Sequence, residues 1–459
     1  MDLLRDAQSM YIVGIKGVGM TSLAQVLRAR GKDVSGSDVA DVFFTDAVLR
    51  ESGIPVLQGF TAENVPKQVD AVVYSTAYTT DHPELAEAIR RRIPLFTYPE
   101  VLGSLLRASE GISIAGTHGK TRTTALCGAI LAADGRDPTV IVGSNVPQFH
   151  GNARIGSGPL LVVETDEYQN KFTHYAPRHC LITSIEYDHP DFFPSAESYV
   201  AAFERFLERI PPRGILVTNA DDQNTEQILG RSGQTSVRFG TKEDADVRLC
   251  SSVWRGNREV FLIRHRGHEE TFTLQMPGRH NALNACAAVA LCRELDVRTT
   301  SIRKALEGFA GIKRRFEFLG STRGALVFDD YAHHPSEISA AIAAARECFP
   351  QRRLVVVFQP HTYSRTQALL PDFAQVLRAD LIILLEVYGS AREKRGTVSS
   401  SDILSAMHPP HNAVVQPTLD EAAAFVQKEL RENDLLLLLG AGDAWKLGEA
   451  LDVKKNVSS

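Results

Sequence analysis

The stretch SIAGTHGKTRTTALCGAIL, residues 113 to 131, decides the fold of this chain. A short apolar segment is followed by a turn bounded by Gly116 and Gly119, then by Lys120 and Thr121, and then by a segment of helical length. Glycines let backbone amides turn inward, a lysine can reach the β- and γ-phosphates, and a threonine hydroxyl can hold Mg²⁺. The stretch predicts a strand, a phosphate loop and a helix that bind a nucleoside triphosphate.

The loop is shorter than the full Walker pattern, which would demand glycine at the position of Ile114. An ordinary turn between a strand and a helix is the alternative interpretation. However, Gly-Lys-Thr at the opening of a helix that follows a buried strand is a specific combination. We therefore favour the phosphate loop.

Outward from this loop, short apolar runs alternate with segments of helical length. Such alternation predicts βα units and mostly parallel sheets that are buried on both faces. Residues 245 to 275 instead alternate in polarity between polar turns, which predicts an antiparallel meander. The predicted parallel strands are 11–15, 33–38, 71–76, 113–117, 160–167, 180–187, 215–220, 326–331, 353–361, 381–388 and 434–442.

The chain has 459 residues, which is too long for one ordinary core and predicts about three domains of about 150 residues. We place their boundaries largely by motif. The expected fold is α/β, with a Rossmann-like N-terminal domain at 1–109 and a Rossmann-like C-terminal domain at 319–459. Between them, residues 110–318 form a P-loop-type ATPase domain with a small antiparallel β insertion.

Composition excludes several classes of protein. The formal net charge of -5 gives no strong attraction to nucleic acid. The six cysteines form no CxxC pair, and their spacing suits neither a zinc site nor a disulfide framework. The N-terminus lacks a basic-then-apolar leader, and the apolar runs are shorter than the ~20 residues that span a bilayer. We expect a cytoplasmic protein without membrane insertion.

The loop GTHGKT resembles the ATP loop of the Mur ligases, the amino-acid-adding enzymes of peptidoglycan synthesis. Further landmarks match that family in order and approximate spacing along essentially the whole chain: VVETDEYQNKF, SIEYDHPDFF, GRHNALNACAA, GIKRRFE and DDYAHHPSEI. The resemblance implies ATP and Mg²⁺ as cofactors. It also implies a reaction in which ATP phosphorylates a carboxylate and an amine attacks the acyl phosphate.

The resemblance further implies which residues form the site. Lys120, Glu164, His189 and Arg365 are the expected catalytic residues, and Thr121, Glu164 and His189 the expected magnesium ligands. The residues expected to bind ATP are Gly116, Thr117, His118, Gly119, Lys120, Thr121, Arg122, His280, Asn281, Asn284, Arg315, Asp330 and His333.

Taken without the resemblance, several of these residues have plainer interpretations. Glu164 at the end of a strand suits a solvated acid equally well, and His189 between Asp188 and Pro190 could cap a turn. Asn281 and Asn284 lie one helical turn apart and could contact a base, but asparagine at such positions is more often an N-cap.

The first domain begins with the segment YIVGIKGVGMTSLAQVLRARG, residues 11 to 31. Its glycines, Gly14, Gly17 and Gly19, do not satisfy the GxGxxG pattern of dinucleotide sites. The resemblance places a UDP diphosphate on the N-terminus of this helix, where free amides favour an anion, and places Asp38 near the uridine. Lys16 stands where relatives that add the first residue usually have glycine, and a lysine is compatible with a diphosphate.

The segment HTYSRT, residues 361 to 366, follows an apolar strand and so lies where ligands of parallel sheets bind. An arginine there can clamp a carboxylate through two hydrogen bonds. The resemblance implies that His361 and Arg365 contact the incoming amino acid or a nearby phosphate. Thr362 stands where some relatives have a second arginine, and a surface arginine is the plainer interpretation of Arg365.

Four hypotheses remain open for the whole chain. The first, which we favour, is a ligase that adds L-alanine to UDP-N-acetylmuramate, and the second is a ligase that recycles a murein tripeptide onto the same sugar nucleotide. The third, a nicotinamide dehydrogenase, leaves GTHGKT and DDYAHHP without a role. The fourth is a silent binding protein, which the joint presence of Lys120, Thr121, Glu164, His189 and Asp330 argues against. We expect a monomer or a homodimer.

Overall fold

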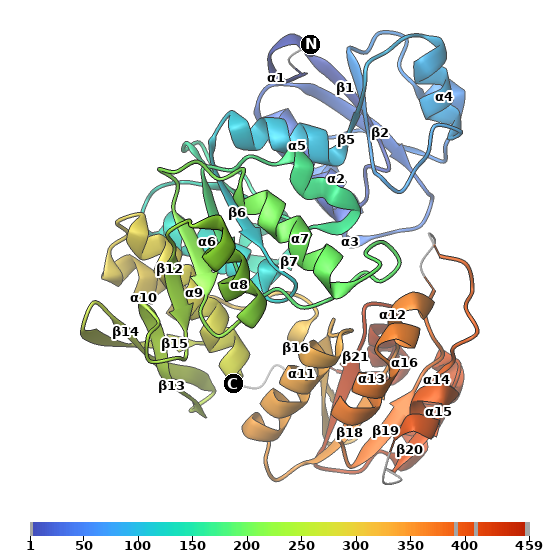
Figure 1. The fold of residues 1–459 in the computed structure, drawn as a ribbon. Helices are drawn as coiled ribbons and strands as arrows, with labels where there is room; N and C mark the ends of the chain where they lie inside the picture. Colours follow the sequence, from blue (N-terminus) through green and yellow to red (C-terminus); the bar gives the residue numbers. More distant parts are fainter. Residues whose placement is uncertain (1–2, 390–392, 408–411, 455–459) are drawn as a thin grey trace.

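The computed structural model describes residues 3–389, 393–407 and 412–454. It contains three β-sheets of five, ten and six strands, each with helices on its faces (Figure 1). The sheets follow one another along the chain, and parallel pairs predominate, as the alternating pattern predicts. The α/β class is therefore confirmed.

The first sheet has the strand order β3-β2-β1-β4-β5 and is parallel throughout. Its central strand is buried from Met10 to Val13 because helices cover both faces. The strands are β1 Ser9–Val13, β2 Asp33–Asp38, β3 Val56–Gln58, β4 Ala71–Tyr74 and β5 Leu95–Thr97. The helices are α1 Leu3–Asp6, α2 Val18–Ala29, α3 Phe44–Glu51, η1 Ala62–Asn64, α4 Pro83–Arg90 and α5 Tyr98–Arg107.

The second sheet has the order β15-β14-β13-β12-β11-β10-β6-β9-β7-β8. The strand that precedes the phosphate loop, β6, lies in the interior of this sheet between β10 and β9. The strands are β6 Glu110–Ala115, β7 Thr139–Val146, β8 Gly151–Arg154, β9 Leu160–Glu164, β10 His179–Ile182, β11 Leu216–Asn219, β12 Val237–Gly240, β13 Val247–Arg255, β14 Arg258–His265 and β15 His268–Leu274. The helices are α6 Lys120–Ala133, η2 Pro147–Phe149, η3 Tyr168–His174, α7 Ala196–Leu207, α8 Gln223–Ser232, α9 Arg279–Glu294 and α10 Thr299–Glu307.

The predicted antiparallel meander is confirmed as β13, β14 and β15. It continues the large sheet, because β13 pairs in parallel with β12 through Phe239 and Val247. Residues of α9 pack over this part of the sheet, and Phe261 and Phe272 belong to the same buried cluster as Cys286. The meander therefore extends the core of the ATPase domain.

The third sheet has the order β16-β17-β21-β18-β19-β20, with β16 antiparallel to β17 and the other pairs parallel. The predicted boundary at 318/319 falls inside β16, which pairs with β17 from Arg315 onward. The strands are β16 Arg315–Thr322, β17 Ala325–Asp330, β18 Arg353–Phe358, β19 Leu381–Leu384, β20 Ala413–Val415 and β21 Asp434–Leu439. The helices are α11 Pro335–Cys348, α12 Tyr363–Ala368, α13 Leu370–Val376, α14 Ser400–Ala406, α15 Leu419–Glu429, η4 Ala444–Lys446 and α16 Leu447–Ala450.

Several predicted strands were too long at their carboxyl ends. The prediction 160–167 ends at Glu164 in the structure, and the prediction 180–187 ends at Ile182. The residues beyond these ends are mostly polar, and side chains such as Asp166 and Glu186 are not buried in the core. They form loops along one edge of the sheet, and these loops carry most of the candidate site.

All six cysteines are free thiols. Among the helices in the described ranges, none is long and apolar enough to cross a bilayer.

Candidate functional site

The predicted phosphate loop connects β6 to α6, and its two glycines have backbone conformations that favour glycine. Gly116 has φ +127° and Gly119 has φ +80°. A Cβ atom at Gly119 would overlap the side-chain amide of Asn284, and one at Gly116 would overlap the hydroxyl of Thr183. The loop therefore approaches α9 and the end of β10 closely, and Lys120 begins α6.

The Lys120 ammonium lies above this loop and donates to the carbonyls of Gly116 and Thr117. Burial alone would lower the pKa of Lys120, but the carboxylates of Glu167 and Glu164 raise it above its usual value. The side chain is therefore a partly buried cation in a loop whose amides favour an anion, which suits a polyphosphate.

Thr121 and Glu164 are brought together as the sequence predicts. The Thr121 hydroxyl donates to Glu164 Oε1 at 2.9 Å, and the Gly143 amide donates to Glu164 Oε2 at 2.7 Å. Glu167, which the sequence analysis did not select, is buried beside them with one carboxylate oxygen that has no hydrogen-bond partner. Carboxylate and hydroxyl oxygens are the ligands that Mg²⁺ prefers, so these residues fit a magnesium ion.

His189 lies at the same edge of the sheet, in the loop after β10. Its backbone is left-handed with φ +56°, and its ring packs on Tyr168 at a centroid distance of 4.6 Å. Its Nε2 atom is 3.7 Å from Glu167 Oε1. His189 therefore faces the carboxylate of Glu167, but it makes no direct contact with Thr121.

A pocket of about 160 Å³ lies beside the phosphate loop and is closed by the third domain. Its apolar wall comes from Phe239, Leu283 and α11, and burial lowers the pKa of His280 to about 3, so that ring is neutral. The predicted residues that line the pocket are His118, Gly119, Arg122, His280, Asn284, Arg315 and Asp330. An apolar pocket with a few amide and imidazole groups suits a flat heteroaromatic base.

Asn281 does not line this pocket. It is fully buried, and its amide donates to the carbonyl of Pro277 at 2.6 Å, one turn earlier in the chain. Asn281 is not an N-cap either, because Gly278 holds that position of α9; its side chain instead bonds back to the chain just before the helix. Asn219 lines the pocket instead, and it stands at the end of β11, where no motif indicated it.

Arg122 connects the second and third domains, and Arg315, in β16 of the third sheet, lines the same pocket. Arg122 of α6 pairs with Asp330 at 3.2 Å, and the Arg122 Nε atom is buried without a partner. Arg315 lies over the ring of Tyr331 and 3.9 Å from Glu337. A polyphosphate bound at the phosphate loop would therefore lie beside these two cations and Asp330.

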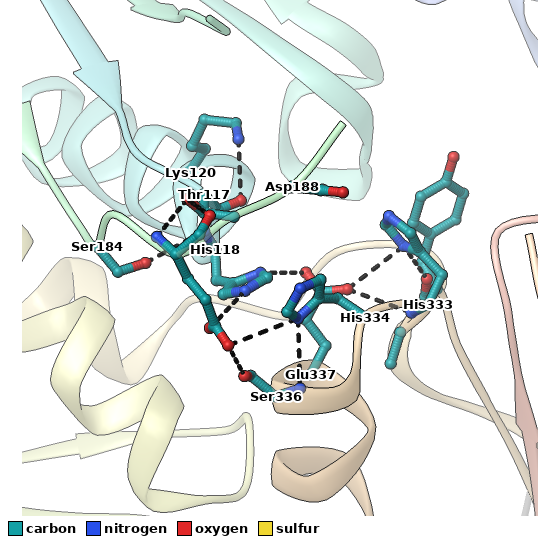
Figure 2. Close-up of polar contacts among 12 residues, drawn as sticks. Thr117, His118, Lys120, Ser184, Asp188, His333, His334, Ser336 and Glu337 are labelled. Carbon is teal, nitrogen blue, oxygen red and sulfur yellow. Dashed lines mark hydrogen bonds and ion pairs between the residues drawn. The ribbon is translucent and has the colours of Figure 1, made fainter. Parts of the chain in front are cut away.

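Glu337 was missed by the sequence analysis, although it lies four residues after His333. It accepts from His118 Nδ1 at 3.3 Å and from the His333 amide at 3.2 Å (Figure 2). Burial opposes its ionisation, but His333, His118 and Arg315 hold its pKa well below the usual value. Glu337 therefore joins the phosphate loop to the start of α11.

A larger cleft of about 1230 Å³ runs from the first domain past the phosphate loop to the third domain. That volume exceeds the range of about 300 to 1,000 Å³ that is usual for one small ligand. Predicted residues of all three domains line it: Gly14, Gly17, Asp38, Thr117, His118, Gly119, Lys120, Thr121, Arg122, Glu164, His189, Arg315 and His333.

At the first-domain end of the cleft, the glycine turn leads into α2, with Gly17 at its N-cap. Gly14 has φ +79°, and a Cβ atom there would lie 2.6 Å from the ring of Tyr78. Gly19 lines a side branch next to Tyr98. The Asp38 carboxylate accepts from the amides of Lys16 and Val39 at 2.7 and 2.8 Å, which fixes the loop.

Lys16 does not present a free ammonium to this loop. Its Nζ donates to the carbonyls of Val39 and Asp41 at 3.0 and 2.9 Å, and it pairs with Asp46 at 2.9 Å. All three N–H groups are thus used within the protein. Lys16 supports the segment after β2, and the idea that it neutralises a diphosphate is not supported.

Arg365 and His361 are not among the residues that line the large cleft; Arg365 is buried in the third domain and already holds the carboxylate of Asp188, which does line it. The Arg365 Nε and Nη2 atoms contact the two oxygens of Asp188 at 2.8 and 3.2 Å, and Nη1 donates to the His361 carbonyl at 3.3 Å. Burial lowers the pKa of His361 to about 4, so its ring is neutral. The surface interpretation of Arg365 is therefore wrong, and the arginine links the third domain to the residue next to His189.

Family models match nearly the whole chain. A Mur ligase catalytic-domain model matches residues 9–110, a Mur ligase middle-domain model 114–292, and a Mur ligase glutamate-ligase-domain model 314–442. These three ranges correspond to the three sheets of the structure in order.

Whole-chain relatives agree with these models. The UDP-N-acetylmuramate–L-alanine ligase of Desulfitobacterium hafniense is 43% identical over 446 residues, which cover 96% of this chain and 98% of that protein. The enzyme of the same name from Salinibacter ruber is 41% identical over 449 residues, covering 96% and 94%. The crystal structure of the UDP-N-acetylmuramate–alanine ligase of Thermotoga maritima superimposes with a TM-score of 0.81 at 29% identity, covering 97% and 98%. On this evidence, the chain belongs to the Mur ligase family.

Proposed function

We propose that the protein is an ATP-dependent ligase that adds L-alanine to UDP-N-acetylmuramate in peptidoglycan precursor synthesis. The acceptor's carboxylate attacks the γ-phosphorus of ATP, which releases ADP and leaves an acyl phosphate. The amine of alanine then attacks the acyl carbon, so that an amide forms, inorganic phosphate leaves and the amine gives up a proton. The predicted compartment for this reaction is the cytoplasm.

One observation supports this proposal more than any other: a single cleft of about 1230 Å³ is lined by the first-domain glycine turn, the phosphate loop and the third domain. A sugar nucleotide on α2 can direct its carboxylate toward Lys120 only if both sites open into the same space. The large cleft provides that space.

Each group around the phosphate loop has a role in bringing two anions together. Lys120 is a partly buried cation at the loop, and Arg122 offers a buried N–H without a partner. Thr121, Glu164 and His189 are the residues that would hold Mg²⁺, which neutralises phosphate charge when bound. Together these groups offset the repulsion between the carboxylate and the phosphate.

The base of ATP is assigned to the pocket beside Asn284 and His280, and the diphosphate of UDP to the N-terminus of α2 near Gly17. Free alanine is assigned to the third-domain end of the cleft near His361 and Arg365. Arg365 is the group there that can clamp a carboxylate, provided that part of its contact with Asp188 is exchanged.

The proposal is tested by measuring phosphate release from ATP and Mg²⁺ in the presence of UDP-N-acetylmuramate and one amine at a time. L-Alanine should support turnover, glycine and L-serine should do so less well, and omission of the sugar nucleotide should abolish it. Rapid hydrolysis of ATP without the sugar nucleotide would contradict the proposal. Efficient use of a murein tripeptide with no response to alanine would favour the recycling reaction instead.

A further inference from the structure

Three side chains with metal-binding atoms meet where the phosphate loop contacts the third domain: His118, Glu186 and His334. Glu186 lies in the loop after β10. His118 follows β6 and His334 is the N-cap of α11, and Figure 2 shows these two histidines next to each other. Their ligand atoms all lie within 4.8 Å of one another. None of the three is among the residues assigned above to Mg²⁺.

One ring nitrogen of each histidine lies toward Glu186, and that of His334 already accepts a hydrogen bond from the Ser336 amide, which an ion would replace. His118 Nδ1 faces Glu337 at 3.3 Å, so Nε2 is the atom that approaches Glu186, at 3.0 Å. His334 Nε2 faces the Tyr187 carbonyl at 3.4 Å, and its Nδ1 accepts from the Ser336 amide and lies 3.9 Å from Glu186. Metal-binding histidines typically have their second nitrogen on a carboxylate or a carbonyl, as both do here.

Glu186 also has a hydrogen-bond partner outside the three-residue cluster, because the Ser336 hydroxyl donates to its Oε1 atom. The Glu186 side chain is 44% exposed, whereas that of His334 is 3% exposed, so an ion could enter from the Glu186 side. Two imidazoles and one carboxylate form a donor set that suits zinc and similar divalent transition metals better than Mg²⁺.

The spacing is close to what one ion requires. Bonds of about 2.0 to 2.2 Å in a tetrahedral site place ligand atoms about 3.3 to 3.5 Å apart. The contacts at 3.0 and 3.9 Å lie on either side of that range. Rotation of the half-exposed Glu186 side chain is the smallest adjustment that would bring the three atoms around one ion.

We propose that His118, Glu186 and His334 form a second cation site, which binds Zn²⁺ or a similar transition metal and ties the third domain to the phosphate loop. Binding replaces the proton between His118 Nε2 and Glu186, and that proton leaves to solvent. Because His118 and Glu186 belong to the second domain and His334 to the third, the ion holds the two domains together. This site goes beyond the proposed ligase reaction and does not depend on it.

The test uses the full chain, treated with a chelator, dialysed, and titrated with Co²⁺ and then Zn²⁺ without nucleotide. The visible absorption of Co²⁺ reports a site with nitrogen ligands and low coordination number, and Zn²⁺ should displace it at one ion per chain. Loss of a residue that only hydrogen-bonds to a metal ligand weakens metal binding by up to about 100-fold. His334→Ala and Glu186→Gln remove ligands themselves, so each should weaken binding by more than that. Ser336→Ala, which keeps all three ligands, should weaken it by about 10- to 100-fold.

The matched control is His268→Ala, because His265 and His268 form a cross-strand histidine pair on β14 and β15, away from the domain junction. This variant should bind Zn²⁺ as the wild type does. Loss of binding in His268→Ala with retention in His334→Ala and Glu186→Gln would overturn the proposal, as would no binding by the wild type. Since the readout is metal binding alone, either result leaves the ligase assignment unaffected.

Discussion

At the scale of single residues, Lys120 gives a specific prediction. Its ammonium lies partly buried at the loop, and the nearby carboxylates raise its pKa and keep it charged. Lys120→Ala should lower turnover by at least about two orders of magnitude, because it deletes a charge directed at the transferring phosphoryl group. Steady-state turnover measures this, and an unchanged circular-dichroism melt serves as the control for folding. Near-normal activity in the folded variant would contradict the assignment of the loop.

A second residue-scale prediction concerns Arg365. If it clamps the carboxylate of alanine, Arg365→Ala should raise the alanine requirement by the equivalent of about 2 to 3 kcal/mol, the cost of a lost charged hydrogen-bond partner. The requirement for ATP should change less. Asp188→Asn is the control, because it keeps the guanidinium and weakens only the ion pair. An equal rise in the alanine requirement in both variants would show that Arg365 acts only through Asp188.

Residues inside recognisable motifs could be placed from the sequence, and residues whose role depends on a partner far away in the chain could not. Thr121 and Glu164 meet as predicted because each stands next to a strand end of one parallel sheet. Lys16 and Arg365 were placed in the right segments, but their partners, Asp46 and Asp188, lie in distant parts of the chain whose positions the sequence does not specify. Glu337 was missed because its role comes from the contact between domains.

At the scale of elements, the phosphate loop and α9 fit each other so closely that Gly119 tests their packing. Gly119→Ala should destabilise the protein and raise the KM for ATP, because alanine is strained at φ +80° and its Cβ would displace Asn284 from the pocket. Thermal melting and ATP kinetics measure the two effects. Gly135→Ala is the control, since Gly135 has a similar φ of +83° with no atom within 4 Å of a Cβ. Equal KM values for ATP in the two variants would argue against the close fit.

The sequence predicted well which segments form strands and helices, but it did not predict well the residues at which they end. The antiparallel pattern of 245–275 was read correctly because alternation and turns are local signals. The strands at 160–167 and 180–187 were predicted several residues too long, since polar residues after a buried strand can belong to a loop that binds a ligand. The path of such a loop depends on its contacts with other loops at the same edge of the sheet.

At the scale of the whole molecule, the proposed function assigns the sugar nucleotide to the first domain, which gives a prediction for that domain. UDP-N-acetylglucosamine at about 100 times its dissociation constant should stabilise the folded protein by about 2.7 kcal/mol, whereas NAD should not. Asp38→Ala should reduce this protection, because Asp38 fixes the loop before α2 through the amides of Lys16 and Val39. Differential scanning calorimetry measures the shift. A shift with NAD and none with the UDP-sugar would favour the dehydrogenase hypothesis.

The central claim is that the cleft shared by the three domains brings a sugar carboxylate to the γ-phosphate of ATP. The most direct test uses UDP-N-acetylmuramate in which both carboxylate oxygens are a heavy isotope, with ATP, Mg²⁺ and L-alanine, and analyses the released phosphate by mass spectrometry. Attack of the carboxylate on the γ-phosphorus predicts that each phosphate released carries one labelled oxygen, because the acyl–oxygen bond breaks when alanine attacks. Unlabelled phosphate formed together with the alanyl product would contradict this account.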